Sequence, residues 1–306
     1  MNRPLRIGVS ACGLLLVLAR DAGAARQEAA TSLPAPAHPA IWVVRDEDTT
    51  VWLFGTVHVL KPGIDWFGGR IREAFDASGD VVLEMLMPDQ AKMARLVAEL
   101  RQKHDVAGLA PLVDRLPGDR RDLYRSTLSG LGIPLQAFDA TPPWMVATAL
   151  EGAALGRRGY GRDAGVESVL SDAAAAGGKT MTGLETAEQQ LGFFESLSPA
   201  AQLSFLAGTL DDLATIGPMI DRLVAGWAAG DADAIASIMN ESVKDSPELA
   251  SVLLYRRNAH WADWIAARMR RPGTVFLAVG AGHLAGAGSL QDELAKRHLV
   301  AARVGP

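Results

Sequence analysis

The stretch VWLFGTVHVL (51–60) is a run of β-branched and aromatic residues that stops at a glycine three positions before a histidine. A second stretch, TVFLAVGAGHLAG (274–286), has the same order near the other end of the chain. Such runs are typical of buried strands, and glycine lets the backbone turn sharply where a strand ends. The two stretches predict two halves, each a strand followed by a G-x-x-H turn, with His58 and His283 just past the strand ends.

Further apolar runs predict the rest of a sheet. IWVV (41–44) is separated from the first of these strands by the polar segment RDEDTT, and this pattern favours a hairpin. DVVLE (80–84) predicts a short buried strand that places Glu84 at its end. Two further strands are expected, at 133–138, which would end at Asp139, and at 179–184.

Helical spacing of apolar residues alternates with these strands. The predicted helices are 89–103, 119–131, 144–155, 166–176 and 289–298, and a long helical tract covers about 199–271. Thr186 and Gln189 match a capping box at the start of another helix. Alternating strands and helices predict an α/β fold. We expect a central mixed sheet with helices packed around it and a large helical insertion at about 199–271.

The N-terminal residues have the pattern of an export signal. Residues 1–24 join a short basic region, an apolar stretch and the small residues Ala22-Gly23-Ala24. We therefore expect removal of residues 1–24, a periplasmic location, a flexible Ala/Pro-rich leader at 25–40 and a single domain at 41–306. An uncleaved anchor and a lipoprotein attached at Cys12 are the alternatives. No other segment is long and apolar enough to predict a transmembrane domain.

Composition narrows the partners. The chain has 306 residues and a formal net charge of −5, from 30 Lys and Arg against 35 Asp and Glu. A mildly acidic chain without a basic run lacks the clustered cations that bind phosphates, so no nucleic-acid partner is expected. A single cysteine excludes an intramolecular disulfide and the Cys-rich zinc modules. The sequence carries no signal for an oligomeric state.

Three ligand-type side chains follow predicted strands. Ligands of α/β proteins bind beyond the carboxyl ends of strands, so His58, Glu84 and His283 are expected to meet there. Two imidazoles and one carboxylate suit a divalent metal ion, with Mn, Co and Zn as candidates. Such an ion lowers the pKa of its bound water and polarises a carbonyl group. The alternative is that both histidines are structural and that Glu84 caps a helix.

Other polar residues are secondary candidates. Glu185 follows a strand and would serve as a general base or hold a metal-binding side chain in place, or it would be a carboxylate at a helix start. Arg257 and Asn258 would bind a substrate carboxylate or oxyanion, or form an ion pair that ties a helix to the sheet. Asp139 is a weaker candidate for the site. His260, in the long helical tract, is expected to pack in the interior.

Five short segments resemble the TraB/PrgY/GumN family, which is related to the Tiki metalloproteases. They are WLFGTVH (52–58), VVLEM (81–85), GLETAEQQ (183–190), RRNAHW (256–261) and AVGAGHLAG (278–286). The chain is similar to the exported, GumN-like bacterial branch. In Tiki-like members the resemblance implies a divalent-metal-dependent peptidase, with roles that fall on His58, Glu84 and His283. One departure is Glu167, which stands where the family usually has Asp; this acid is a candidate for metal or substrate contact.

The sequence therefore predicts an exported, metal-dependent hydrolase that acts on a peptide or protein substrate. One alternative is a non-catalytic binding or accessory protein on the same fold, for example in surface polysaccharide biosynthesis or export. Another is an iron oxygenase with two histidines and one carboxylate, which the helix-rich sequence disfavours because such enzymes usually have a jelly-roll strand pattern.

Overall fold

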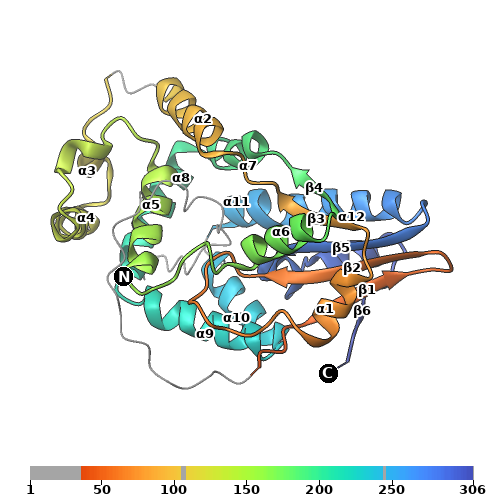
Figure 1. Cartoon of the computed structure of the whole chain (residues 1–306). Helices are drawn as coiled ribbons and strands as arrows, with labels where there is room; N and C mark the ends of the chain where they lie inside the picture. Colours follow the sequence, from red (N-terminus) through yellow and green to blue (C-terminus); the bar gives the residue numbers. More distant parts are fainter. Residues whose placement is uncertain (1–35, 105–107, 244–245, 306) are drawn as a thin grey trace.

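The computed structural model describes residues 36–104, 108–243 and 246–305. The proposed signal, Cys12 and most of the leader lie outside the described residues. A six-stranded mixed sheet crosses the molecule in the order β4-β3-β5-β2-β1-β6 (Figure 1). The strands are β1 (Ile41–Arg45), β2 (Thr49–Thr56), β3 (Asp80–Met85), β4 (Thr180–Glu185), β5 (Gly273–Gly280) and β6 (Ala302–Arg303).

The four strands from β4 to β2 are parallel, and this direction brings their carboxyl ends to one edge. In the β2–β5 pair, Gly55 lies opposite Val279 and Thr56 lies opposite Gly280. The two G-x-x-H turns therefore start within one residue of the same level. β1 forms the expected antiparallel hairpin with β2, and β6 pairs antiparallel to β1.

Helices surround the sheet and extend beyond its carboxyl edge. The α-helices are α1 (Gly69–Asp76), α2 (Gln90–Lys103), α3 (Leu112–Arg115), α4 (Gly118–Leu131), α5 (Pro143–Gly156), α6 (Val166–Ala176), α7 (Ala187–Glu195), α8 (Pro199–Asp212), α9 (Ile216–Ala228), α10 (Ala232–Val243), α11 (Pro247–Ala250), α12 (Arg256–Arg268) and α13 (Leu290–Ala295). The 3₁₀ turns η2 (Leu135–Phe138) and η4 (Ala281–Leu284) and the π turn η3 (Ser251–Tyr255) complete them. The expected helical insertion is confirmed, because α8 to α12 lie between β4 and β5.

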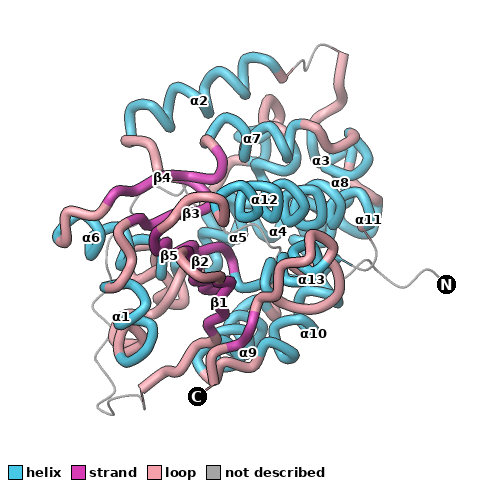
Figure 2. The backbone as a smooth tube through the Cα atoms, turned by 90° about the vertical axis from the view of Figure 1, so that its right-hand side faces the viewer, coloured by secondary structure: helices cyan, strands magenta, loops and turns pink. Residues whose placement is uncertain are grey.

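Alternate strand residues point to opposite faces, and each face has its own hydrophobic core. On β5, Phe276 and Ala278 pack in one cluster with α1, α6, α9 and α10. Val275 and Leu277 pack in the other cluster, with α12 and α13. Figure 2 shows α1 and α6 on one side of the strands and α12 and α13 on the other.

A third cluster forms a separate helical half. It contains residues of α2, α3, α4, α5, α7, α8 and the α11–η3 segment, which pack around the stacked rings of Trp144 and Phe194. In Figure 1 the arrowheads of the central strands point toward this half. The carboxyl edge of the sheet therefore meets the helical half, and polar side chains from both meet there. None of the described helices is both long and apolar enough to span a bilayer.

One predicted strand is wrong. Residues 133–138 form the 3₁₀ turn η2, and Ile133, Leu135 and Phe138 pack against the helical half. A short apolar run does not distinguish a strand from a buried turn, and Pro134 starts this one. Asp139 consequently ends no strand. Its Oδ1 accepts a hydrogen bond from Leu112 N at 2.9 Å, at the start of α3.

Candidate functional site

Each of the four parallel strands delivers one polar side chain to the carboxyl edge of the sheet. Glu185 ends β4, Glu84 is the penultimate residue of β3, His283 lies in η4 directly after β5, and His58 follows β2. A Cβ atom placed on Gly280 would lie 3.1 Å from Glu84 Oε1, 3.5 Å from His58 Nε2 and 3.6 Å from His283 Cδ2. Glu84 and the two histidines therefore surround one small volume beside Gly280, as their positions after strands led us to expect.

His283 is held in one tautomer. Its side chain is 2% exposed, and Nδ1 lies 2.6 Å from Asn258 Oδ1 on α12. The amide oxygen can only accept, so we assign the proton to Nδ1 and the lone pair to Nε2. Burial lowers the pKa of His283, and the nearby Arg257 cation lowers it further, to about 3. The imidazole is therefore neutral, and Nε2 lies 3.8 Å from Glu84 Oε1.

His58 has a different environment. Its side chain is 22% exposed, and Nδ1 lies 2.6 Å from Glu167 Oε1 in the first turn of α6. Burial lowers the pKa of His58, but the Glu167 carboxylate outweighs this effect and raises it above the usual value. The Thr56 hydroxyl also donates to Glu167 Oε1. The longer acid at position 167 therefore contacts the His58 imidazole and fixes the orientation of that ring.

Close backbone packing makes this contact possible. Gly165 is the N-cap residue of α6, and a Cβ atom there would lie 2.1 Å from the carbonyl oxygen of His58. Only glycine allows α6 to approach so closely. Val166 N also donates to Val57 O at 3.1 Å. The start of α6 is thus fixed against the first G-x-x-H turn.

Arg257 joins the two acidic strand ends. Its Nη2 lies 2.6 Å from Glu84 Oε2 and 2.8 Å from Glu185 Oε2, and its Nε lies 2.9 Å from Glu185 Oε1. The guanidinium is buried, with its Cζ 4.6 Å from the Trp261 ring centre and 5.5 Å from that of Phe193. The structure therefore places Arg257 in the ion pair that ties α12 to the sheet.

The Glu84 carboxylate is kept ionised by its neighbours. Burial raises its pKa, but the Arg257 cation, the two imidazoles and the backbone N–H of Gly280 lower it to about 2. The Gly280 N–H donates to Glu84 Oε1 at 2.6 Å. Burial lowers the pKa of Arg257, and the two carboxylates outweigh this effect and raise it.

The π turn η3 positions Arg257 at the start of α12. In a π turn the backbone bonds skip one residue further than in an α-helix, and such turns are frequent at functional sites. Here the Leu253 carbonyl accepts a hydrogen bond from Arg257 Nη1 at 3.2 Å. Sequence periodicity gave no sign of this local widening, because the apolar spacing of a single π turn resembles that of an α-helix.

Gln190 is a site residue that the sequence analysis missed. Its side chain is fully buried, and Nε2 donates to Glu185 Oε2 at 2.9 Å and to Glu84 Oε2 at 3.4 Å. Its Oε1 has no hydrogen-bond partner among the described residues. The signal was present, because the capping box at Thr186 is confirmed and places Gln190 in the first turn of α7, facing back toward Glu185.

The side chains suit a divalent ion in their chemistry. Both imidazoles have Nδ1 bound to a fixed acceptor, as metal-binding histidines do. Because the Glu167 carboxylate raises the pKa of His58, an ion at His58 Nε2 would have to displace the proton from that nitrogen. Two carboxylates also face a single guanidinium, and the excess of negative charge favours a bound cation. His58, Glu84 and His283 are the residues that would hold it.

The present arrangement is not a finished ligand set. Arg257 Nη1 lies 3.2 Å from His283 Nε2 and competes for that lone pair. In residues 36–104, 108–243 and 246–305, no group of three or more His, Cys, Asp or Glu side chains is arranged to hold a metal ion. Ligation by His283 would therefore require Arg257 Nη1 to move aside.

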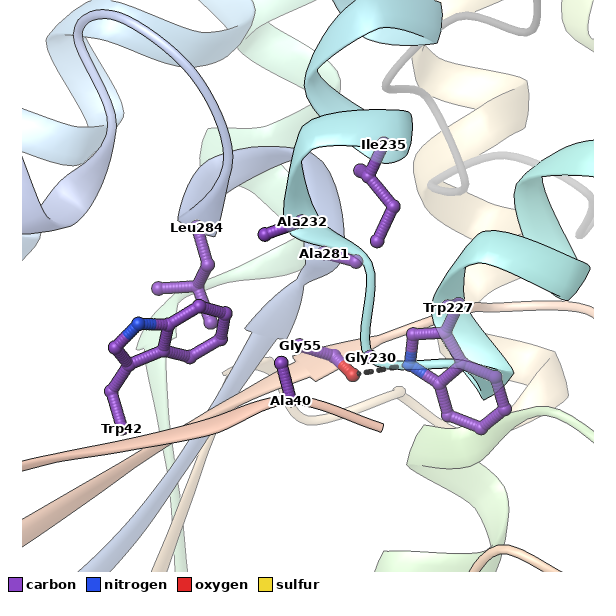
Figure 3. Close-up of a pocket in the computed structure, with 9 residues that line it drawn as sticks. All are labelled: Ala40, Trp42, Gly55, Trp227, Gly230, Ala232, Ile235, Ala281 and Leu284. Carbon is purple, nitrogen blue, oxygen red and sulfur yellow. Dashed lines mark hydrogen bonds between the residues drawn. The ribbon is translucent and has the colours of Figure 1, made fainter. Parts of the chain in front are cut away.

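A small apolar cavity lies behind the G-x-x-H turns and is distinct from this site (Figure 3). Trp42, Ala281 and Leu284 contribute to its lining, and Trp227 Nε1 donates to Gly55 O at 2.8 Å. None of the candidate polar residues lines it. The bond from Trp227 ties α9 to the first motif and supports the turn that carries His58.

His260 does not pack in the interior as expected, because α12 turns this residue to solvent. Its neighbours Arg257, Asn258 and Trp261 point inward instead. The buried face of α12 is thus the one that carries the site residues, and His260 lies outside it.

The fold and the site together define a mixed α/β protein whose parallel strands end in two histidines and two glutamates, with a buried arginine that contacts both glutamates and His283. A family model described as the TraB/PrgY/gumN family matches residues 40–302. The chain belongs to this family, which confirms the resemblance inferred from its motifs.

The relatives carry no assigned activity. The chain is 22% identical over 274 residues to an uncharacterized protein of Treponema pallidum (strain Nichols), covering 85% of this chain and 81% of that protein. It is 29% identical over 183 residues to the uncharacterized protein YbaP of Escherichia coli (strain K12). This match covers 60% of this chain and 67% of YbaP. The same values hold for YbaP of Shigella flexneri. No solved structure matches the chain significantly.

Proposed function

We propose that the chain is a divalent-metal-dependent hydrolase that acts on peptide bonds, with the ion held by His58, Glu84 and His283. One observation carries the proposal. Two imidazoles with anchored Nδ1 atoms and one ionised carboxylate surround the same small volume beside Gly280. Imidazole nitrogens and carboxylate oxygens are the ligands that Zn²⁺ and Mn²⁺ accept from proteins.

When bound, a divalent ion supplies an acidified water and polarises a carbonyl group. The chain's own residues have separate tasks. Glu84 remains an anion because Arg257 compensates its charge. His58 is the partly exposed member of the set, so a substrate approaches from its side.

Glu185 is better suited to positioning than to proton transfer. Its two oxygens accept hydrogen bonds from Arg257, from Trp261 Nε1 at 3.0 Å and from Gln190 Nε2. A general base needs a free oxygen within reach of the proton that it removes. We therefore assign Glu185 to holding Arg257, and through it Glu84, as a positioning residue.

The test is peptide hydrolysis by the purified protein with Mn²⁺, Co²⁺ or Zn²⁺ and a broad peptide library. His58→Ala and His283→Ala should abolish cleavage, whereas His260→Ala, an exposed histidine on α12, should keep it. Thermal unfolding of each variant shows whether the fold is retained. If the wild type cleaves no peptide with any of these ions, the proposed hydrolase activity is wrong. A binding or accessory role, for example in surface polysaccharide export, then replaces it.

A further inference from the structure

Among the described site residues, those at the first G-x-x-H turn are the more exposed to solvent. The side chains of His58 and Glu167 are 22% and 25% exposed, whereas those of Glu84, Arg257 and His283 are almost completely buried. Any substrate therefore reaches the reacting groups past the first G-x-x-H turn. The residues around that opening are the ones that decide which substrates enter.

Two segments meet at this opening. The loop after β3 carries Leu86 and Met87, which are 39% and 45% exposed and lie two and three residues after Glu84. The glycine-containing loop before α6 carries Arg162, whose Nη2 lies 3.6 Å from Met87 Sδ. Met87 is therefore an exposed apolar side chain in contact with a cation, and the exposed Leu86 precedes it in the chain. Contiguous exposed apolar groups can mark a binding surface.

Arg162 has no carboxylate in direct contact, although the charges of Glu167 and Asp163 act on it from further away. In the described part of the chain no carboxylate oxygen lies within 4.0 Å of its guanidinium, and Met87 Sδ is the side-chain atom that it contacts. The nearest acid on α6, Glu167, is already engaged by His58 and Thr56. Arg162 is nevertheless close enough for its charge to act on the His58 imidazole.

A partly buried guanidinium with no carboxylate in direct contact is suited to binding one. Its planar fork of N–H donors matches two carboxylate oxygens, and partial burial strengthens charge-assisted hydrogen bonds. The adjacent Leu86 and Met87 would at the same time cover an apolar side chain, because Met adapts its shape to irregular partners.

We propose that Arg162, Leu86 and Met87 form a docking site for polypeptide segments in which a carboxylate adjoins an apolar side chain. The carboxylate binds Arg162, and the apolar side chain packs on Leu86 and Met87. This inference deepens the proposed function and rests on it for one point, that the docked segment is the substrate. The group that binds Arg162 is the C-terminal carboxylate of the docked peptide, and an acidic side chain in its place is an outcome of the test.

Peptide binding, measured by isothermal titration, tests the docking site without requiring turnover. The probes are acetyl-Ala-Ala-Leu with a free carboxylate, the same peptide as its amide, and acetyl-Ala-Leu-Glu amide. We expect the free acid to bind at least about tenfold more tightly than its amide, because hydrogen bonds to charged groups are stronger. Tighter binding of the acidic-side-chain peptide than of the free acid would identify an internal acid as the natural partner.

Three variants make the test specific. Arg162→Gln should reduce the affinity for the free acid to that for the amide. Met87→Ser should reduce the affinity for the acid and for the amide by the same factor. Arg157→Gln, an exposed arginine of the same loop, should change neither.

Equal affinity of acid and amide, wild-type affinity in Arg162→Gln, or no binding of any probe would overturn the docking site. A protein that binds the free acid through Arg162 but cleaves no peptide would overturn only the proposed hydrolase activity. Cleavage without any preference for acids would overturn the docking site alone.

Discussion

At the scale of single residues, Gly280 is the position where the candidate site is most sensitive to one added atom. It faces Glu84 Oε1, His58 Nε2 and His283 Cδ2, and its φ of −49° and ψ of 135° suit alanine as well as glycine. An alanine methyl group can therefore be added without backbone strain, but it would fill the volume that the three side chains surround.

Gly280→Ala is expected to fold and to lose both metal binding and hydrolysis. The methyl carbon would stand 3.1 Å from Glu84 Oε1, so the carboxylate must shift by a few tenths of an ångström while the rest of the fold is kept. Metal content and thermal unfolding should be measured together. Gly192→Ala, a glycine of α7 with open space around it, is the control. A Gly280→Ala protein with full metal content would show that the ion, if bound, lies elsewhere.

The buried neutral imidazole of His283 makes stability depend on pH. Its pKa is about 3 in the folded chain against 6.5 for a free histidine, so between these values the unfolded state binds more protons. Its contribution to stability is complete above pH 6.5 and is lost as the pH falls toward 3. In the presence of a chelator, urea unfolding between pH 7 and 4 should show a smaller loss of stability in His283→Gln than in the wild type. Identical pH dependence would contradict a buried neutral His283.

At the scale of elements, α6 is held to the first G-x-x-H turn by the absence of one side chain. A Cβ atom on Gly165 would lie 2.1 Å from the His58 carbonyl oxygen, a backbone atom that cannot rotate away. We expect Gly165→Ala to displace the start of α6, to separate Glu167 from His58, and to destabilise the protein by about 1–3 kcal/mol, as overpacking typically does.

Gly161→Ala is the matched control for this prediction, since it lies in the same loop and has open space around it. Urea unfolding gives the change in stability, and the titration of His58 by NMR reports whether Glu167 still raises its pKa. If Gly165→Ala unfolds like the wild type and keeps the raised pKa, the close packing of α6 is not what orients His58.

Element ends were predictable where the sequence marks them chemically. The G-x-x-H glycines, the capping box at Thr186 and the prolines at helix starts each mark a boundary, and the structure has elements ending or beginning there. The η2 turn was not predictable, because its three apolar residues fit a strand as well as a buried turn. Helix α1 and strand β6 were missed because they are short and carry few apolar positions.

At the scale of the whole molecule, Arg257 connects the sheet to the helical half. Glu84 and Glu185 come from adjacent strands, while Gln190 and Phe193 come from α7, which packs in the helical half. The sequence predicted which strands would end in polar side chains, and that these side chains would meet, because parallel strands share an edge. It did not predict that Arg257 and Gln190 would bind both acids, since these contacts join residues far apart in the chain and depend on how the helices pack.

Export is a proposal that concerns residues outside the described ranges. The basic, apolar and small-residue order of residues 1–24 leads us to propose cleavage after Ala24 and a periplasmic location. N-terminal sequencing of protein produced in a Gram-negative host should give Ala25 as the first residue. An intact Met1 on membrane-bound protein would show an uncleaved anchor, and a lipid-modified Cys12 would show a lipoprotein.

The most direct test of the central proposal is the metal content of the protein purified without a chelator, measured by mass spectrometry of the elements. We predict about one divalent ion per chain, since three protein donors leave a metal such as Zn²⁺ an open position for water. His58→Ala and His283→Ala should lose the ion, and the exposed His260→Ala should keep it. A folded wild-type protein that contains no divalent metal, and that binds none when Mn²⁺, Co²⁺ or Zn²⁺ is added, would contradict the account.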